Sequence, residues 1–178
     1  MTQYAGKTIP ATFQNNAVKF KDRPYAAYKK DGTFIDISWE EMQKMVNNLA
    51  FYLIAKGIKK GDKVGIFAAN RYEWHMAALA ITSIGAVDVP IYSTNSPEET
   101  HYVLEHSDAR LCFVGSNQQL EFSLKVRDRL PLVEEYIIFD TYSGNASGVK
   151  TLQQVLGEGE SKPAEEELSA RINAIQGN

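Results

Sequence analysis

The chain has 178 residues, of which 44% are hydrophobic and 23% charged, enough to build an ordinary globular core. Its formal net charge of −3 leaves no excess of lysine and arginine to neutralise a phosphate backbone, so nucleic-acid binding is not expected. No stretch approaches the about 18 apolar residues of a membrane span, and the first residues show no secretory pattern, so we expect a cytoplasmic protein without a transmembrane segment.

Residues 1–37 predict a helix followed by a hairpin. Apolar side chains recur at helical spacing across residues 8–20. Two short strand-like stretches follow, at 25–28 and 34–37, and the turn Lys30-Asp31-Gly32 is expected to join them.

A long amphipathic helix is predicted after the hairpin. Ser38 is placed to cap it, and Glu41, three positions later, completes a capping box. Apolar residues then keep one face hydrophobic, and Gly57 ends the helix. The capping signal and the apolar stripe agree, which makes this the first long helix of the core.

The chain then repeats a strand-then-helix unit. Buried strands are predicted at 64–68, 87–92, 111–114 and 136–139. The helices between them are expected to start at Asn70, with Glu73 at the third helical position, at Ser96 and at Asn117. Continuous apolar strands that alternate with amphipathic helices are typical of a parallel sheet covered on both faces. The predicted fold class is α/β, a mainly parallel sheet with helices on both faces.

The last part of the chain is predicted to be a connecting loop and a charged helical tail. We therefore expect three regions: 1–37 as helix and hairpin, 38–140 as the strand–helix core, and 141–178 as loop and tail. The stretch GNASGVKT at 144–151 resembles a phosphate-binding loop, but only three residues separate its glycines and Val149 precedes the lysine. Because the backbone cradle depends on loop length, this stretch predicts a surface loop.

Ser93, Thr94 and Asn95 are the candidate site residues that the pattern itself gives. They follow the predicted strand 87–92, and in open parallel sheets ligands bind outside the carboxyl ends of the strands. The alternative is that they only cap and hydrogen-bond the loop. No catalytic residue and no metal site is predicted, because the three histidines do not form a ligand set and Cys112 lies in an apolar run.

Residues 38–114 carry a set of spaced features that together resemble a known family. The features are Trp39 with Glu41, Gly57 with Lys60-Gly61-Asp62, Asn70 with Glu73-Trp74, Ala80, Gly85-Ala86-Val87, Val89-Pro90, Tyr92 with Thr94, and Tyr102 with Leu104. They resemble the amino-terminal segment of the adenylate-forming acyl-CoA synthetases of the AMP-binding superfamily. The form VPIYSTNSPEE is most similar to the long-chain fatty-acid ligases, and the resemblance covers about residues 8–140.

The resemblance implies ATP-dependent activation of a fatty acid to an acyl adenylate, followed by displacement of AMP by the thiol of CoA. ATP, magnesium and CoA would serve the full-length enzyme, and the loop of Tyr92, Ser93 and Thr94 would lie on the CoA side. The family's phosphate loop, aromatic-x-Glu motif, ribose-binding aspartate and catalytic lysine have no match in these 178 residues. We therefore expect an inactive amino-terminal fragment that binds no cofactor by itself.

A freestanding α/β module that binds a nucleotide or a protein stays open as the alternative. The continuation of the gene distinguishes the ligase fragment from the freestanding module. The family's phosphate loop would be present there for the fragment and absent for the module. If the chain is a fragment, faces that the rest of the enzyme covers would be left apolar and exposed. Self-association, as a homodimer, is the expected consequence.

Overall fold

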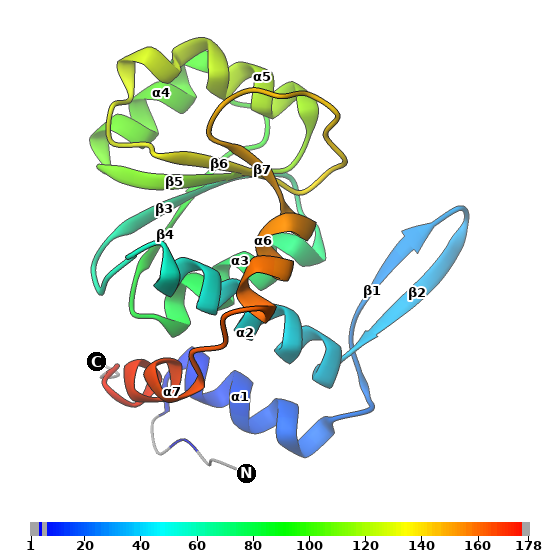
Figure 1. Cartoon of the computed structure of the whole chain (residues 1–178). Coiled ribbons are helices and arrows are strands. Elements are labelled where there is room, and N and C mark those ends of the chain that lie inside the picture. Colours follow the sequence, from blue (N-terminus) through cyan, green and yellow to red (C-terminus); the bar gives the residue numbers. More distant parts are fainter. Residues whose placement is uncertain (1–3, 5–6, 176–178) are drawn as a thin grey trace.

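The computed structural model describes residue 4 and residues 7–175, and its centre is a five-stranded parallel sheet (Figure 1). The strand order is β4-β3-β5-β6-β7, and every neighbouring pair runs parallel. The strands are β3 (Lys63–Phe67), β4 (Val87–Ile91), β5 (Ala109–Val114), β6 (Glu135–Ile138) and β7 (Val149–Thr151). The four predicted strands are present with their ends shifted by one or two residues, and the predicted α/β fold class is confirmed.

Helices cover both faces of this sheet (Figure 1). One face carries α4 (Pro97–His106) and α5 (Asn117–Val126), the latter followed by a short 3-10 turn at Arg127–Arg129. The other face carries α2 (Trp39–Ala55), α3 (Tyr72–Ser83) and α6 (Leu152–Glu160), with α1 (Ile9–Phe20) and α7 (Glu165–Asn173) outside them. None of the helices in the described part of the chain is long and apolar enough to cross a membrane.

Alternate residues of the central strands β3, β5 and β6 enter two separate hydrophobic cores. Ile66 and Phe113 point into the larger core with α2 and α3, whereas Phe67, Cys112 and Val114 point into the smaller core with α4 and α5. This follows from the period of two along a strand, which sends neighbouring side chains to opposite faces. A strand buried on both faces must be apolar throughout, which is why these strands are continuous hydrophobic runs.

The chain leaves β3 and β5 toward opposite faces of the sheet. β3 continues into α3 on one face, and its neighbour β5 continues into α5 on the other. Such a change of direction opens a crevice at the carboxyl ends of the two strands, the usual position of a ligand site in open parallel sheets. The topology therefore predicts that a ligand site would be formed by the loops that follow β3, β4 and β5.

Two of the predicted N-caps are present as capping boxes. The Glu41 backbone N–H donates to Ser38 Oγ at 3.1 Å while the Ser38 N–H donates to Glu41 Oε2 at 2.8 Å. Ser96 and Glu99 form the same reciprocal pair at the start of α4. Each box satisfies N–H groups that the first helical turn would otherwise leave without partners.

The predicted caps at Asn70 and Asn117 are wrong. The N-cap of α3 is Arg71, which makes no side-chain capping bond, because a guanidinium only donates hydrogen bonds; it pairs with Glu73. The N-cap of α5 is Ser116, while the Asn117 amide donates to the Thr141 carbonyl at 3.1 Å. At α5 the capping signal is local but begins one residue earlier than predicted, at Ser116, whose hydroxyl accepts from the Gln119 N–H.

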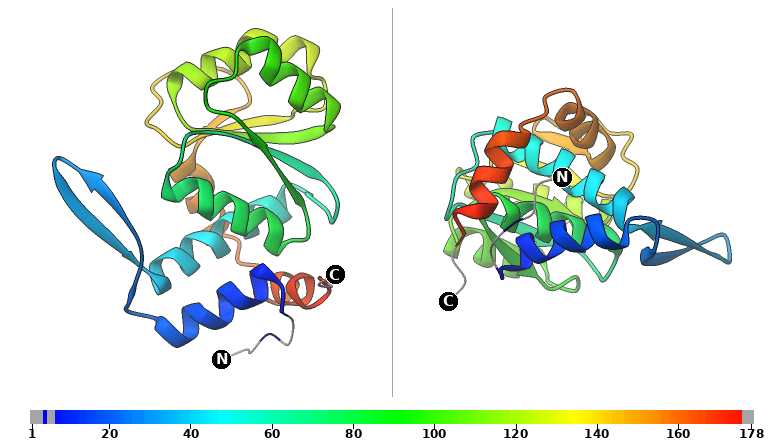
Figure 2. Two further views of the ribbon diagram at one scale, coloured as in Figure 1. Left: turned by 180° about the vertical axis from the view of Figure 1, so that it is seen from behind. Right: turned by 90° about the horizontal axis from the view of Figure 1, so that it is seen from below.

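The predicted hairpin is present and projects away from the body of the molecule (Figure 2). Its strands, β1 (Pro24–Lys30) and β2 (Thr33–Ser38), pair antiparallel. The turn places Asp31 and Gly32 at φ of 49° and 82°, the left-handed conformation typical of a tight two-residue hairpin loop. At the base of the hairpin, Tyr25 packs edge-on against Trp39, with ring centroids 4.8 Å apart.

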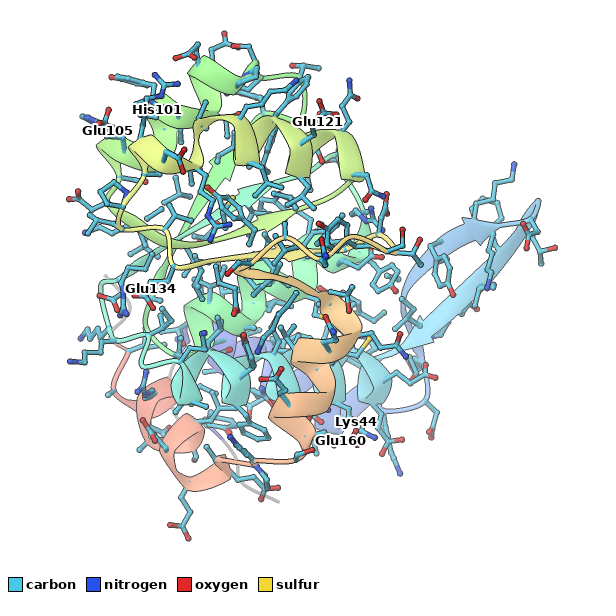
Figure 3. The ribbon with its side chains drawn as sticks, turned by 45° about the horizontal axis from the view of Figure 1, so that its top comes forward. Lys44, His101, Glu105, Glu121, Glu134 and Glu160 are labelled. Carbon is cyan, nitrogen blue, oxygen red and sulfur yellow. The ribbon has the colours of Figure 1, made fainter. Side chains whose placement is uncertain are left out.

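Residues 149–173 add a strand and two helices that pack onto the core. The sequence pattern predicts a surface loop at 144–151, but its last three residues form β7, which pairs with β6 at the sheet edge. β7 is short and only partly buried, so it lacks the apolar run that identifies the other strands. Helix α6 then lies against α2, where Lys44 Nζ and Glu160 Oε1 meet at 2.8 Å (Figure 3).

Candidate functional site

An open cleft of about 570 Å³ lies at the carboxyl ends of β3 and β4. One wall is the segment after β3, one is the end of β4 with the loop that follows, and α3 contributes an indole ring. The lining residues are Ala68, Ala69, Asn70, Trp74, Pro90, Ile91, Tyr92 and Ser93. The cleft therefore occupies the sheet edge where the topology and the sequence both place a ligand.

The predicted site residues lie at this cleft to different degrees. Tyr92 and Ser93 line it, and the Tyr92 side chain is 83% exposed. Thr94 is exposed in the same loop but is outside the lining set. The loop is a tight turn in which the Asn95 N–H donates to the Tyr92 carbonyl at 2.9 Å. The structure thus brings two of the three predicted residues to the cleft.

The capping alternative does not account for these hydroxyls. The side chain that caps α4 is Ser96, through its capping box with Glu99. The side chains of Ser93 and Thr94 lie outside that box and are exposed. Capping of α4 therefore leaves both hydroxyls free to contact a ligand.

An ionic cluster next to the cleft was missed by the sequence patterns. Arg71 donates through Nε and Nη2 to the two carboxylate oxygens of Glu73, both at 2.8 Å, and through Nη1 to Asp140 Oδ1 at 2.9 Å. The side-chain hydrogen bond to Glu73 is the main cause that raises the pKa of Arg71, and the Asp140 bond adds to it. The guanidinium is therefore fully charged and engaged with protein carboxylates.

Two side chains that flank this cluster also line the cleft and were not predicted as site residues. Asn70 precedes Arg71, and Trp74 follows Glu73 in the first turn of α3. The available signal was position: both lie just beyond the carboxyl end of a predicted strand, as the predicted loop does. Trp74 adds an aromatic surface to a wall that is otherwise made of small side chains.

Cys112 and the acidic residues offer no second site. Cys112 is fully buried, and burial raises the pKa of its thiol to about 12, so it carries no thiolate at neutral pH. Within residue 4 and residues 7–175, no three histidine, cysteine or acidic side chains are grouped so that they could hold a metal ion. His101 and Glu105 face each other on α4, with Nδ1 and Oε2 3.8 Å apart, but this pair belongs to no group of three (Figure 3).

The fold and the cleft define a parallel α/β protein with an open cleft at the carboxyl edge of its sheet, and comparison with known proteins gives the family. The family described as "AMP-binding enzyme" matches residues 13–171. This chain belongs to that family of adenylate-forming enzymes.

Curated relatives of the chain are long-chain-fatty-acid–CoA ligases. FadD15 of Mycobacterium bovis is 33% identical over 158 residues, which cover 87% of this chain and 25% of that protein. The ligase heimdall of Drosophila melanogaster is 29% identical over 180 residues, covering 97% of this chain and 26% of that protein. The chain thus spans about a quarter of the length of these relatives.

A solved structure supports the same fold over the whole chain. The anthranilate CoA ligase AuaEII, crystallised in complex with anthranoyl-AMP, superposes with a TM-score of 0.76 at 18% identity. The match covers 100% of this chain and 30% of that one. At this identity the likeness concerns the fold.

Proposed function

We propose that this chain is the amino-terminal part of a long-chain fatty-acid–CoA ligase, which joins a fatty acid to CoA with conversion of ATP to AMP and pyrophosphate. The observation that carries the proposal is its similarity to long-chain-fatty-acid–CoA ligases over 87% and 97% of its length. ATP, magnesium and CoA are the cofactors of the proposed whole enzyme. Its proposed location is the cytoplasm.

The described residues of the cleft do not fit a nucleoside triphosphate. The lining set described above contains neither lysine nor arginine. Arg71, which lies beside it, already pairs with Glu73 and Asp140. Because adenylyl transfer depends on positive charge around the phosphates, we propose that this chain alone is catalytically inactive and contributes no group to that step.

The cleft fits the polar, weakly charged part of a CoA-like ligand better. It offers the exposed ring of Tyr92, the indole of Trp74 and the hydroxyl of Ser93. Aromatic rings cover the apolar surface of an uncharged ligand chain, and exposed hydroxyls donate and accept hydrogen bonds. We therefore assign Tyr92, Ser93 and Thr94 to the CoA side of the whole enzyme.

Replacing Thr94 with phenylalanine is expected to separate the two half-reactions. The test uses an intact ligase in which this chain replaces the matching quarter of the Mycobacterium bovis relative, hereafter the chimera. Thioester formation should fall about tenfold, while fatty-acid-dependent pyrophosphate exchange should change less than about twofold, because only the second step needs CoA. Both rates are measured on the same preparation.

The matched control is Thr33 to phenylalanine, at an exposed position of β2 away from the cleft. This variant should leave both rates unchanged. If Thr94→Phe lowers both half-reactions equally, Thr94 is a folding residue and its CoA-side role is wrong.

A freestanding nucleotide- or protein-binding module is the second candidate. It is favoured by the packing of the described residues, which form two hydrophobic cores around one sheet. The coding sequence after Asn178 separates the candidates. A stretch rich in serine, threonine and glycine followed by Pro-Lys-Gly supports the ligase, and an immediate stop codon supports the module.

We further propose that the chain self-associates through its hairpin. Phe34 is 70% exposed and Ile35 is 38% exposed, and these successive residues of β2 point to opposite faces of the ribbon. An isolated two-stranded hairpin is marginally stable, so covering these faces is favourable.

Light scattering at high concentration should detect a dimer. Phe34→Ser should weaken this dimer, while Tyr102→Ser, on α4, should not. A monodisperse monomer would contradict this proposal.

A further inference from the structure

Both walls of the cleft are linked to Gly115, just after β5, one through Arg71 and the other through Gln119. On one side, Arg71 Nη1 donates to the Gly115 carbonyl at 2.8 Å. On the other, Gln119 Oε1 accepts from the Gly115 N–H at 3.1 Å while Gln119 Nε2 donates to the Ser93 carbonyl at 3.2 Å. Gly115 is therefore linked to the wall after β3 and to the wall after β4.

The orientation of the Gln119 amide is fixed by its surroundings. The side chain is 8% exposed, in the first turn of α5. Its oxygen faces the N–H of Gly115 and its nitrogen faces the carbonyl of Ser93, so only one placement of the amide satisfies both partners. This single side chain thus connects the start of α5 to the loop that carries Tyr92.

The Arg71 side of the linkage is equally constrained. Glu73 is 7% exposed, so its carboxylate depends on the guanidinium for compensation. The same guanidinium also holds the Gly115 carbonyl and Asp140. Because Asn70 and Trp74 flank this pair along the chain, its geometry determines where those two lining residues stand.

Gly115 allows this arrangement because it has no side chain. A Cβ at this position would lie 2.8 Å from Gln119 Oε1 and 2.9 Å from the Cβ of Ala68. Contacts shorter than about 3 Å require the neighbours to shift, and here the neighbours are the linking amide and the cleft wall. The close approach of the three segments therefore requires glycine.

We propose that Arg71, Gly115 and Gln119 form a positioning brace that fixes the separation between the two walls of the cleft. Gln119 holds the loop of Tyr92 and Ser93, and Arg71 holds the segment of Asn70 and Trp74. The ligand class is a polar, weakly charged chain that carries amide groups, which enters between Trp74 and Tyr92. Its assignment as CoA rests on the proposed function, whereas the brace itself does not.

The brace is tested in the 178-residue chain by replacing Gln119 with glutamate. This change keeps an oxygen toward the Gly115 N–H but sets a second oxygen against the Ser93 carbonyl. The backbone order parameters of Ser93 and Asn95, measured by ¹⁵N relaxation, should fall from about 0.85 to below about 0.6, while those of β3 should not change. The Trp74 indole resonance should also shift.

Gln119→Met provides a second variant that is expected to fold. It removes both hydrogen bonds at similar volume, and the Gly115 N–H keeps its bond to the Phe67 carbonyl at 2.9 Å. It should mobilise the same loop. Gln153→Glu, the same chemical change at an exposed position of α6, is the control and should leave the loop rigid. If the backbone order parameters of Ser93 and Asn95 are unchanged in both Gln119 variants, the brace proposal is wrong.

Enzyme kinetics in the chimera then separate the brace from the proposed function. Gln119→Met should raise the KM for CoA about fivefold or more, with little change in pyrophosphate exchange, because a mobile wall binds the ligand less well. A mobile loop with an unchanged KM for CoA would support the brace and contradict the CoA-side assignment of the loop. A purely structural role would instead lower both half-reactions together.

Discussion

Replacing Gly159 with alanine is expected to destabilise the protein by about 2–3 kcal/mol, because the new methyl group has no space. A Cβ at Gly159 would lie 1.8 Å from the Asn48 carbonyl oxygen of α2. That oxygen is a backbone atom, so it cannot rotate away as a side chain could. Helix α6 would have to move off α2, its main packing partner.

Gly157 provides the matched control for this prediction, two positions earlier in α6. A Cβ at Gly157 would meet nothing within 4 Å, and the residue is exposed. Alanine there should raise the free energy of unfolding by about 0.5–1 kcal/mol, because alanine favours the helix interior over glycine. Denaturant unfolding of both variants measures the effect. A stabilising effect at both positions would contradict the docking of α6 on α2.

The 178-residue chain alone is expected to form no acyl adenylate and to bind ATP with a Kd weaker than about 1 mM. The cleft has no lysine or arginine among its described lining residues, and Arg71 is already paired with two carboxylates. Phosphates in such a site lack the charge that stabilises them. Isothermal titration calorimetry and a pyrophosphate-release assay with a long-chain fatty acid provide the measurements.

The intact Mycobacterium bovis relative serves as the positive control in both assays. Micromolar ATP binding by the 178-residue chain would contradict this prediction and would favour a freestanding nucleotide-binding module. Fatty-acid-dependent pyrophosphate release by the chain alone would overturn the proposal that it is inactive.

Elements specified by local chemistry were predicted well from the sequence. The capping boxes of Ser38 and Ser96 need only a partner three residues away, so their signals are complete within one turn. The central strands β3, β5 and β6 are largely apolar because both of their faces are buried, and this requirement is visible in the sequence itself. The succession of hairpin, helices and strands along the chain follows from these local signals.

Features that depend on distant partners were not predicted. The pairing of Arg71 with Asp140, 69 residues away, was missed because the topology of the sheet brings the two together. β7 was missed because three half-buried residues at an edge carry no apolar run. Its pairing with β6 is visible only in the assembled sheet.

The residues of the candidate site fall into the same two groups, those with a local sequence signal and those that depend on distant partners. Ser93 was predicted because it follows a recognisable strand, and Tyr92 because the family resemblance includes it in the same loop; both lie at the cleft. Trp74 and Gln119 were not predicted, because their relation to the cleft depends on how α3 and α5 pack against neighbouring strands. Gln119 reaches a carbonyl 26 residues away, a contact for which the sequence gives no local signal.

The chimera tests the central claim most directly, because it asks whether this chain can act as the amino-terminal quarter of a long-chain fatty-acid–CoA ligase. The measurement is acyl-CoA formation from a long-chain fatty acid, ATP and CoA by the chimera and by each of its two parts alone. The proposal predicts that the chimera forms the thioester and that neither part does. A chimera that unfolds cooperatively, and is therefore folded, yet forms neither acyl adenylate nor thioester would contradict it.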